Sequence, residues 1–406
     1  MNTAIVLGGT ADHIHLIRIL KNRGFYVILC DYLDNPPAKQ YADAYKQISI
    51  LDKEAILEFA SRKNTALVIA TCIDQALETS AFVSEKLGLP CHINYQTSLT
   101  LTNKNSMKSI MTKNSISTSR YVILKESNDI SKFDFFNYPL VIKPVDANSS
   151  KGVFLINTPE EILDFFDTSM SYSKTKEVIV EEFVEGKELS VDIFIENGKA
   201  EILMITENIK TKNNPKSFTI IESVYNRYIE DNLKESIKGI ANKIIQAFGL
   251  TTGPLLLQCI YNEKQDKLSV IEFSNRVGGG SKYFFINRLK GVDIIDAFVG
   301  SVLGNKPELK EITPKYNFAK IKYLYTRKGI IEEYKGLENL KRNGTIIEYF
   351  IYKKPGSEVY ESLKSSDRCI GLFYVSENEG ELRKKEEVSS RQVKVIDRNG
   401  FDILLR

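Results

Sequence analysis

Apolar residues along the first hundred positions recur with alternating strand and helix periods. Strands are predicted at 4–7, 26–30 and 66–70, and helices at 15–23, 52–62 and 74–87. Asp52 and Asp74 stand where the second and third helices begin, so each is predicted to cap its helix. Strands that alternate with helices build parallel sheets, so residues 1–100 are predicted to form a parallel α/β domain.

Strand signals outnumber helix signals in the rest of the chain. Strands are predicted at 139–145, 153–156, 178–180, 189–195, 201–207, 254–261 and 268–274, and helices at 103–113, 232–248 and 293–303. A polar run at 210–217 predicts a loop, and Gly-Asn-Lys-Pro at 304–307 predicts a boundary. Beyond it lie short strands with charged turns, at 319–325, 345–351, 369–376 and 393–396. Residues 306–406 are therefore predicted to form a small β-rich domain, either a cap or a dimerisation domain.

The most informative polar residues lie inside two apolar strands, where Gln258 interrupts PLLLQCIY and Glu272 interrupts LSVIEFS. If these strands pair, an amide oxygen and a carboxylate come together, which suits a hard cation such as Mg²⁺. Arg276 and the glycines at 278–280 follow at the strand exit, where a guanidinium can bind phosphate or carboxylate and the glycines allow close backbone approach. The alternative is that each residue has a separate structural role: Gln258 bonds a neighbouring strand, Glu272 pairs with a lysine, and Arg276 is solvated. The occurrence of all three residues together disfavours this alternative.

A lysine also lies inside an apolar strand. Lys143 interrupts PLVIKPV, and its burial is costly unless the side chain snorkels to solvent or its ammonium meets an anion such as phosphate. The segment 146–152, DANSSKG, has short side chains that leave backbone N–H groups free to approach phosphate oxygens, and Lys151 adds charge. A hairpin loop without a ligand fits this segment equally well.

Residues 178–192, VIVEEFVEGKELSVD, join two predicted strands through an acidic exit and a glycine turn. Glutamates there can accept hydrogen bonds from an adenine amino group or from ribose, and the Val184 backbone offers the donor and acceptor that a purine edge needs. By itself the segment is also typical of an acidic surface hairpin. Its position between the Lys143 strand and the Gln258 and Glu272 strands favours an adenine-binding hinge, with Glu181 and Glu188 as the nucleotide contacts.

Composition narrows the class of protein. The 406 residues are 43% apolar with a net charge of only +3, so nothing in the balance calls for nucleic acid or an anionic membrane as a partner. Five cysteines without a C-x-x-C pair favour a reducing compartment. Without a basic leader or an apolar run of membrane-spanning length, we expect a soluble, cytoplasmic protein.

A dinucleotide site is the alternative use of the first domain. Gly8 and Gly9 follow a strand, and Asp31 ends the next one at about the spacing of a ribose-binding acid. The full G-x-G-x-x-G pattern is absent, because residues 11–13 are Ala-Asp-His. A glycine turn within a plain α/β scaffold is therefore the favoured interpretation over a nicotinamide oxidoreductase.

Four motifs follow one another along the chain: NKNSMK at 103–108, PLVIKP at 139–144, EEFVEGKELSVD at 181–192, and QCIY at 258–261 followed by VIEFSNRVGGG at 270–280. In this order they resemble the ATP-grasp superfamily, and more closely its carboxylate–amine ligase branch. That branch includes relatives of the carbamoyl-phosphate synthetase large subunit, the purine-biosynthetic ligases and the L-amino-acid ligases. The resemblance covers about residues 1–305. It implies a pre-ATP-grasp domain at 1–100 and an α+β ATP-grasp domain at 101–305, with subdomains 101–180 and 181–305.

The resemblance implies a nucleotide contact for several of these residues. Lys104 and Lys143 would hold ATP phosphates, with Lys151 beside them. Glu181 and the Val184 backbone would meet adenine, and Glu188 would bind ribose.

The metal and reaction centre would lie on the last motif. Gln258 and Glu272 would be magnesium ligands, and Arg276 would face the transferred phosphate or the acyl-phosphate, acting with Lys143 in catalysis. The sequence departs from the family in two places. The loop 146–152 has a single glycine where relatives often have several, and Ser274 stands where an asparagine ligand is common. Either Ser274 or the next residue, Asn275, would complete the metal site.

The implied reaction is phosphoryl transfer from ATP to a substrate carboxylate, followed by attack of an amine on the acyl-phosphate and release of ADP and phosphate. Such chemistry depends on charge neutralisation and positioning rather than on a protein nucleophile. The implied cofactors are ATP and Mg²⁺, with Mn²⁺ as the alternative ion, and the partners are a small carboxylate and a small amine. The family favours a homodimer. The alternative function is an ATP-binding protein of the same fold without ligase activity.

Overall fold

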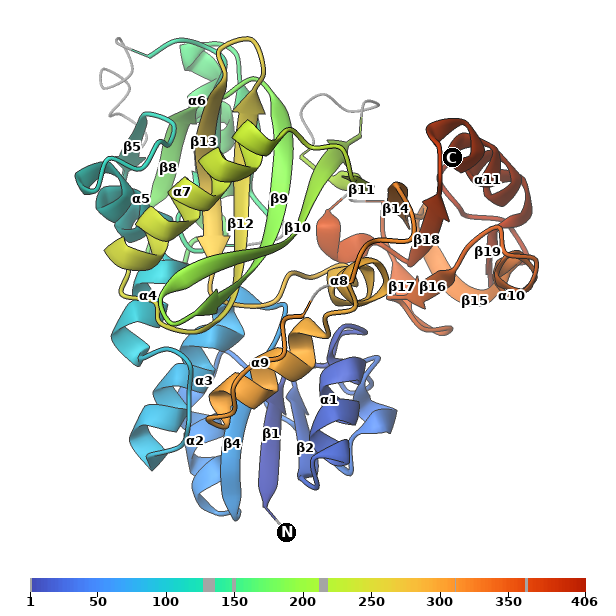
Figure 1. Cartoon of the computed structure of the whole chain (residues 1–406), viewed down its shortest axis with the longest axis horizontal. Coiled ribbons are helices and arrows are strands. Elements are labelled where there is room, and N and C mark those ends of the chain that lie inside the picture. The colour runs from blue at the N-terminus through green and yellow to red at the C-terminus, as the bar shows by residue number, and fades with distance from the viewer. Residues whose placement is uncertain (1, 127–135, 148–150, 212–217, 311, 362–363) are drawn as a thin grey trace.

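The N-terminal part of the chain forms a parallel α/β lobe, as predicted. The computed structural model describes residues 2–126, 136–147, 151–211, 218–310, 312–361 and 364–406 (Figure 1). The first elements are β1 (Thr3–Leu7), α1 (His13–Asn22), β2 (Tyr26–Asp31), β3 (Ala44–Gln47), α2 (Lys53–Ser61), β4 (Thr65–Ala70) and α3 (Asp74–Leu87). The strands pair in the order β3-β2-β1-β4, and the β1–β2, β1–β4 and β2–β3 pairs are all parallel. Helix α1 buries its apolar face, including Leu16, Ile17 and Leu20.

The two predicted helix caps have different outcomes. Asp52 caps α2, because its carboxylate accepts a hydrogen bond from the backbone N–H of Ala55 at 3.0 Å. The prediction for Asp74 is wrong: Ile73 occupies the cap position of α3, and Asp74 is the first residue of the helix. Its carboxylate instead binds Arg276, at 2.7 and 2.9 Å. A local sequence pattern cannot reveal a partner that is 202 residues away.

The structure favours the glycine turn over the nicotinamide alternative. The Asp31 carboxylate accepts hydrogen bonds from the backbone N–H groups of Gly9 and Leu33, at 2.7 and 2.8 Å, so it serves the turn rather than a ribose. The Pro36 ring lies so close to Gly9 that an added Cβ would come within 2.6 Å of it. The glycines therefore make a tight turn in the scaffold, which was the favoured interpretation.

A small antiparallel sheet forms the next lobe. The connecting helices are α4 (Tyr95–Thr102) and α5 (Lys104–Lys113), and the lobe itself contains β5 (Tyr121–Leu124), β6 (Leu140–Pro144), β7 (Phe154–Ile156), α6 (Pro159–Ser171) and β8 (Val178–Glu182). The strand order is β5-β8-β6-β7, and α6 packs against β6 and β7. The centre of the predicted phosphate loop, 148–150, lies outside the described residues, as does most of the polar run at 210–217.

A second sheet continues from the middle of the chain into its C-terminal part. Its first half comprises β9 (Lys187–Glu196), β10 (Lys199–Lys210), β11 (Ile220–Asn226), α7 (Asp231–Ala247), β12 (Gly253–Asn262), β13 (Lys267–Ser274), α8 (Lys282–Lys290) and α9 (Ile294–Val302). Its strands pair in the order β13-β12-β9-β10-β11, and the sheet continues with the C-terminal strands β14 (Phe318–Leu324), β18 (Ile370–Ser376) and β16 (Glu348–Ile351). Strands β8 and β9 thus belong to different sheets, so the acidic-hairpin interpretation of 178–192 is wrong and the segment is a connection between lobes.

The C-terminal residues are joined to this sheet by the antiparallel pairing of β11 with β14. They form β14 (Phe318–Leu324), β15 (Gly329–Lys335), α10 (Leu337–Arg342), β16 (Glu348–Ile351), β17 (Glu358–Val359), β18 (Ile370–Ser376), α11 (Glu379–Gln392) and β19 (Lys394–Asp397). Helix α11 was not predicted, because only Leu382 and Ser389 are buried in an otherwise polar segment. Its start is nevertheless marked by Asn378, whose side chain accepts a hydrogen bond from the N–H of Glu381.

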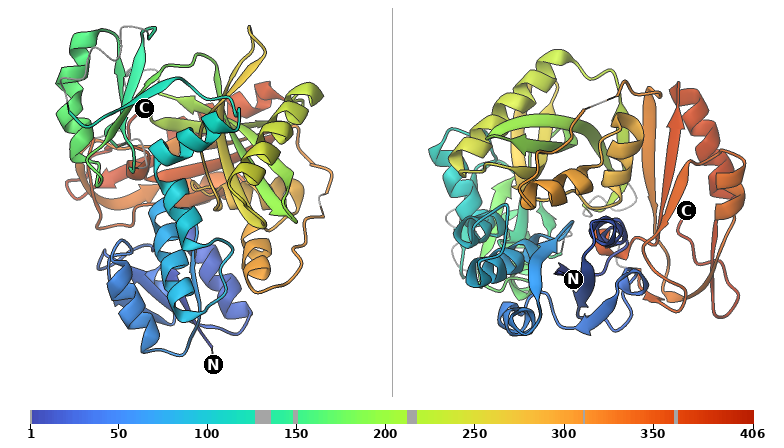
Figure 2. Two further views of the ribbon diagram at one scale, coloured as in Figure 1. Left: turned by 90° about the vertical axis from the view of Figure 1, so that its left-hand side faces the viewer. Right: turned by 60° about the horizontal axis from the view of Figure 1, so that its bottom comes forward.

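One apolar core joins the three parts of the chain. It contains Leu16 of α1, Phe298 of α9 and Phe373 of β18, all nearly or fully buried. Ion pairs support the contact between α1 and α9, with Arg23 and Asp296 2.7 Å apart. In the left-hand view of Figure 2, the small-sheet lobe lies at the top and the N-terminal lobe at the bottom. Within the described residues, no helix is both long and apolar enough to span a membrane.

The buried His13 generates a prediction about pH. Its side chain has no exposed surface, and burial lowers its pKa to about 4 from an ordinary value of 6.5. Between these two values the unfolded chain binds the proton more readily, so stability falls as the pH drops through this window. The expected loss at pH 5 is about 2 kcal/mol.

Replacement of His13 by Gln should remove this contribution. Denaturant unfolding at pH 7.5 and pH 5 should show a larger loss of unfolding free energy in the wild type than in His13→Gln, by about 2 kcal/mol. Between pH 7.5 and 8.5 the two proteins should change in parallel. Equal losses in both proteins at pH 5 would contradict the assignment.

Candidate active site

A pocket lies between the small sheet and the large sheet and encloses about 970 Å³ of space, including the opening at its mouth. The lining residues named in the sequence analysis are Lys104, Lys143, Lys151, Glu181, Val184, Glu188, Gln258 and Glu272. The remaining two, Ser274 and Arg276, line an adjoining recess that shares Lys104, Gln258 and Glu272 with the pocket. The fold therefore brings all ten predicted residues to one continuous region.

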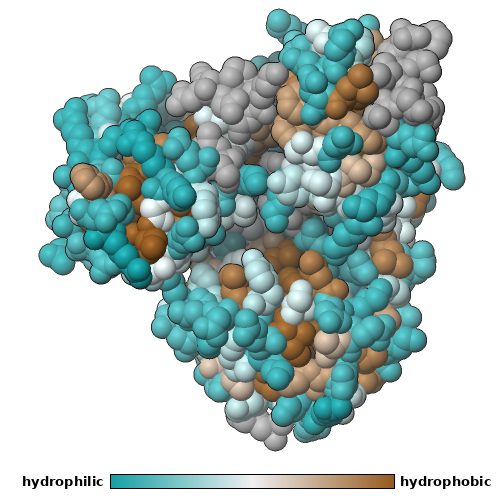
Figure 3. Space-filling view, turned by 180° about the vertical axis from the view of Figure 1, so that it is seen from behind, coloured by the Kyte–Doolittle hydropathy of each residue, from teal (hydrophilic) through white to brown (hydrophobic). Residues whose placement is uncertain are grey.

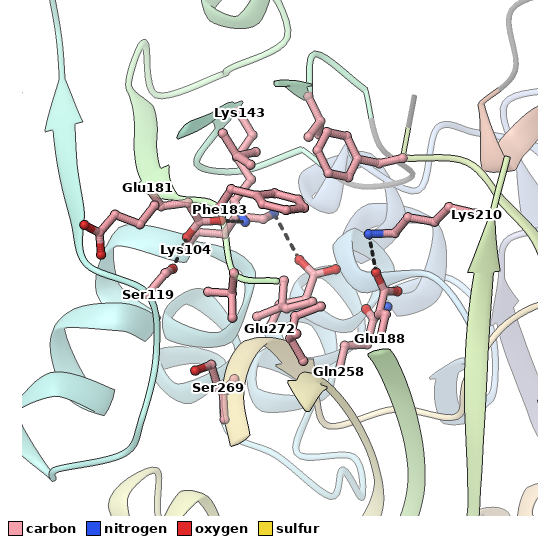
Figure 4. A pocket seen from close by; sticks show the side chains of 18 of the residues that line it. Lys104, Ser119, Lys143, Glu181, Phe183, Glu188, Lys210, Gln258, Ser269 and Glu272 are labelled. Atoms are coloured by element: carbon pink, nitrogen blue, oxygen red, sulfur yellow. Dashed lines mark hydrogen bonds and ion pairs between the residues drawn. The ribbon is translucent and has the colours of Figure 1, made fainter. Parts of the chain in front are cut away.

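Glu181 lies at one end of the pocket (Figure 4), and its carboxylate is bound by two lysines. It is the fourth residue of β8, and its carboxylate pairs with Lys143 of β6 and, at 2.6 Å, with Lys108 of α5. Burial alone would raise the pKa of Glu181, but the two ammonium groups and their hydrogen bonds hold it at about 2. Lys143 therefore meets a protein carboxylate, which the strand pattern could not indicate.

Glu188 lies at the opposite side of the pocket, near the start of β9. Its carboxylate pairs with Lys210 at 2.6 Å and accepts a hydrogen bond from Asn208 at 3.0 Å. The two predicted nucleotide glutamates are thus held apart by the change of sheet between β8 and β9. Glu188 is 8% exposed, so it is a fixed acceptor at the pocket wall.

The connection between β8 and β9 forms the edge of the pocket at Phe183 and Val184. The backbone N–H of Phe183 donates to the carbonyl of Pro139 at 3.1 Å, which ties the connection to the small sheet. Gly186 has a φ of +145°, and an added Cβ would overlap the backbone oxygen of Tyr261. A residue without a side chain is therefore required where the chain enters the large sheet.

Gln258 and Glu272 are directly opposite each other on β12 and β13, as predicted. Lys104, at the start of α5, approaches Glu272 to 3.5 Å and donates to the carbonyl of Ala147 at 2.7 Å. Ser274 is on the same face of β13 as Glu272, since the two are separated by one residue. Asn275 is fully buried and donates to the carbonyl of Pro254 at 2.8 Å, so Ser274 is the better placed of the two alternatives.

These side chains fit a magnesium ion that is bound together with a nucleotide. Within the described residues, no group of three or more His, Cys, Asp or Glu side chains is arranged to hold a metal. Magnesium in nucleotide enzymes commonly takes one or two carboxylates and completes its shell with phosphates and water. The carboxylate of Glu272, the amide oxygen of Gln258 and the hydroxyl of Ser274 therefore suit a magnesium ion that is also bound by phosphates and water. They do not suit an ion that is bound by protein ligands alone.

Arg276 is bidentate with Asp74, and its third nitrogen, Nη1, donates to the carbonyl of Val277 at 3.0 Å. The guanidinium is thereby fixed beside Glu272 and Ser274 in the adjoining recess. Its neutralisation by Asp74 was not predicted, because Asp74 had been interpreted as a helix cap. A role of Arg276 toward a transferred phosphate remains a prediction.

The glycines after Arg276 pass between charged side chains of all three parts of the chain. An added Cβ would come within 2.8 Å of Asp192 at position 278, within 3.7 Å of Asp12 at position 279, and within 2.6 Å of Arg368 at position 280. Asp12 accepts the backbone N–H groups of Gly280 and Ser281, at 3.0 and 2.8 Å. Seen from behind, the surface of the molecule is hollowed where the lobes meet (Figure 3).

The glycines at 278–280 mark the junction of the three parts of the chain. Three charged residues at this junction were missed by the sequence analysis. Asp192 is 1% exposed, one of its oxygens has no hydrogen-bond partner among the described residues, and burial raises its pKa. Burial lowers the pKa of Lys282, which donates to the Thr206 hydroxyl at 3.0 Å. Arg368 lies 4.0 Å from the centre of the Tyr323 ring, and its Nε has no partner in the described part of the chain. Only Asp192, a polar residue within an apolar strand, carried a sequence signal.

Comparison with known sequences agrees with this geometry. Residues 136–283 match the family described as the ATP-grasp domain. The chain is 23% identical over 320 residues to the L-arginine-specific L-amino acid ligase of Bacillus subtilis. The aligned region covers 78% of this chain and 76% of that ligase. It is also 28% identical over 169 residues to a formate-dependent phosphoribosylglycinamide formyltransferase of Erythrobacter litoralis, with 41% and 43% covered.

Solved structures share the whole fold. The L-amino acid ligase of Bacillus licheniformis matches with a TM-score of 0.80 at 19% identity, over 98% of this chain and 99% of that one. The phosphoribosylglycinamide synthetase of Anaerococcus prevotii matches with a TM-score of 0.76 at 18% identity, over 98% and 100%. Residues 136–283 thus match an ATP-grasp domain, and the chain is similar in sequence and fold to ATP-grasp carboxylate–amine ligases.

Proposed function

We propose that this protein is an ATP- and magnesium-dependent ligase that activates a carboxylate as an acyl-phosphate and joins it to an amine. The observation that carries the proposal is the pairing of Gln258 with Glu272 across from Lys104, at the place where the pocket meets the recess of Arg276. A cationic group and the proposed metal ligands are thus adjacent, as phosphoryl transfer requires.

The nucleotide would extend along the pocket from the β8–β9 connection to the Gln258 and Glu272 pair. Adenine would lie against Phe183 and Val184, and Glu188 would accept hydrogen bonds from ribose. The phosphates would be bound by the lysines on the wall of the pocket, which are Lys104, Lys143 and Lys151. Magnesium, held by Gln258, Glu272 and Ser274, would neutralise the charge of the phosphates.

The carboxylate and the amine would meet at the recess beyond Arg276. The γ-phosphoryl group passes to a carboxylate oxygen and ADP leaves. The amine nitrogen then attacks the carbonyl carbon, the bond to phosphate breaks, and the nitrogen loses a proton as the amide forms. Buried charges of both signs at the junction, on Asp192, Lys282 and Arg368, suit substrates that themselves carry both charges, such as amino acids.

The decisive experiment measures ADP release over amino acids and small carboxylates and amines, presented singly and in pairs. We expect release to depend on magnesium and on both a carboxylate and an amine, with the amide product detected by mass spectrometry. Binding of ATP without release above the rate for ATP alone, across the whole panel, would favour the ATP-binding protein without ligase activity.

Replacement of Glu272 by Gln should remove the carboxylate of the proposed metal site and lower ADP release by about a hundredfold or more. Increasing magnesium should restore part of the loss if the ligand set is correct. Glu263→Gln is the matched control, because Glu263 lies in the turn of the same hairpin and its side chain is 58% exposed. Turnover of Glu272→Gln equal to that of the control would refute the metal assignment.

A further inference from the structure

We propose that Lys108 is a positioning residue for the ATP phosphates: it holds one oxygen of Glu181, so that the other oxygen fixes the Lys143 ammonium at the pocket wall. This inference rests on the proposed ATP-dependent function. Lys108 is absent from the residues that line the pocket, and its side chain is 1% exposed. It therefore acts through Glu181 rather than by contact with the nucleotide.

The contacts of Lys108 satisfy its ammonium group completely. Its three N–H donors have three acceptors, which are the hydroxyls of Thr118 and Ser119, at 2.7 and 2.8 Å, and the Glu181 carboxylate at 2.6 Å. Each hydroxyl accepts from Lys108 and in turn donates its own hydrogen: Thr118 donates to the carbonyl of Val270 at 2.8 Å, and Ser119 donates to Glu181 at 2.9 Å. No donor of Lys108 is left for a ligand.

The two carboxylate oxygens of Glu181 have different partners. Its Oε2 accepts from both Lys108 and Ser119, whereas its Oε1 contacts Lys143. Lys143 has no other ion-pair or hydrogen-bond partner among the described residues, although it is only 5% exposed and lines the pocket. Two of its three ammonium donors are therefore available to an anion in the pocket.

The charges explain why a second lysine is useful. Glu181, Lys108 and Lys143 together carry one negative and two positive charges, so one positive charge remains at the pocket wall. Without Lys108, the buried pair of Glu181 and Lys143 would be neutral, and the carboxylate would compete with phosphate for Lys143.

A purely structural role for Lys108, the attachment of α5 to the small sheet, makes different predictions. It would affect folding stability and every ligand of the pocket alike, whereas positioning of Lys143 concerns the phosphates alone. Adenosine and Mg-ATP binding, measured on the same variants, separate the two roles.

The experiment is calorimetric titration of the full chain with Mg-ATP and with adenosine. The wild type is measured first, and its failure to bind Mg-ATP would refute the proposed function itself. In Lys108→Met we expect the Kd for Mg-ATP to rise on the order of tenfold while the Kd for adenosine stays within about twofold. Lys113→Met, at the exposed end of the same helix, is the matched control and should bind both ligands as the wild type does.

The double variant Lys108→Met, Glu181→Gln restores the net charge of the site and removes the competing carboxylate. We expect its Kd for Mg-ATP to return to within about threefold of the wild-type value. An unchanged Kd in folded Lys108→Met, or equal weakening of adenosine and Mg-ATP, overturns the proposal. If Lys108→Met does not fold, the double variant decides: tenfold weaker binding of Mg-ATP, or failure of this variant to fold as well, overturns it.

Discussion

The structure depends on the passage of the chain from one sheet to another between Glu182 and Lys187. Strand β8 ends in the small sheet and β9 begins in the large one, and Gly186 allows the backbone to pass close to Tyr261. Because both strands are buried in separate sheets, neither can move without disrupting a core. The pocket is the space between the two sheets, and this connection forms its edge.

Burial of charge gives the pocket its chemistry. Glu181 and Glu188 are almost fully buried, and each is bound to lysine, so the walls are polar without being hydrated. Such pairs contribute little net stability, since desolvation offsets the Coulomb attraction. They do fix side-chain directions. An anionic ligand would then meet cations that are already oriented, which is the form of preorganisation that phosphoryl transfer requires.

The junction around the glycines that follow Arg276 belongs to no single lobe. Asp12 comes from the N-terminal lobe, Asp192 and Lys282 from the middle of the chain, and Arg368 from the C-terminal strands, and all lie around the glycines that follow Arg276. The core that contains Leu16, Phe298 and Phe373 holds these parts together. Substrate recognition at this junction would therefore depend on the placement of whole lobes, and the same fold could accept different substrates by changes at few positions.

The sequence by itself determined the parallel order of helices and strands near the N-terminus and the pairing that places Gln258 opposite Glu272. It also indicated which residues line the pocket and its adjoining recess, because each of these features is encoded in local periodicity or in a family motif. Only the tertiary structure decided that Asp74 binds Arg276, that the C-terminal strands extend the large sheet, and that Lys108 shares Glu181 with Lys143. These contacts join residues far apart in the chain. Their energies depend on burial and on distance in space, which spacing along the sequence does not express.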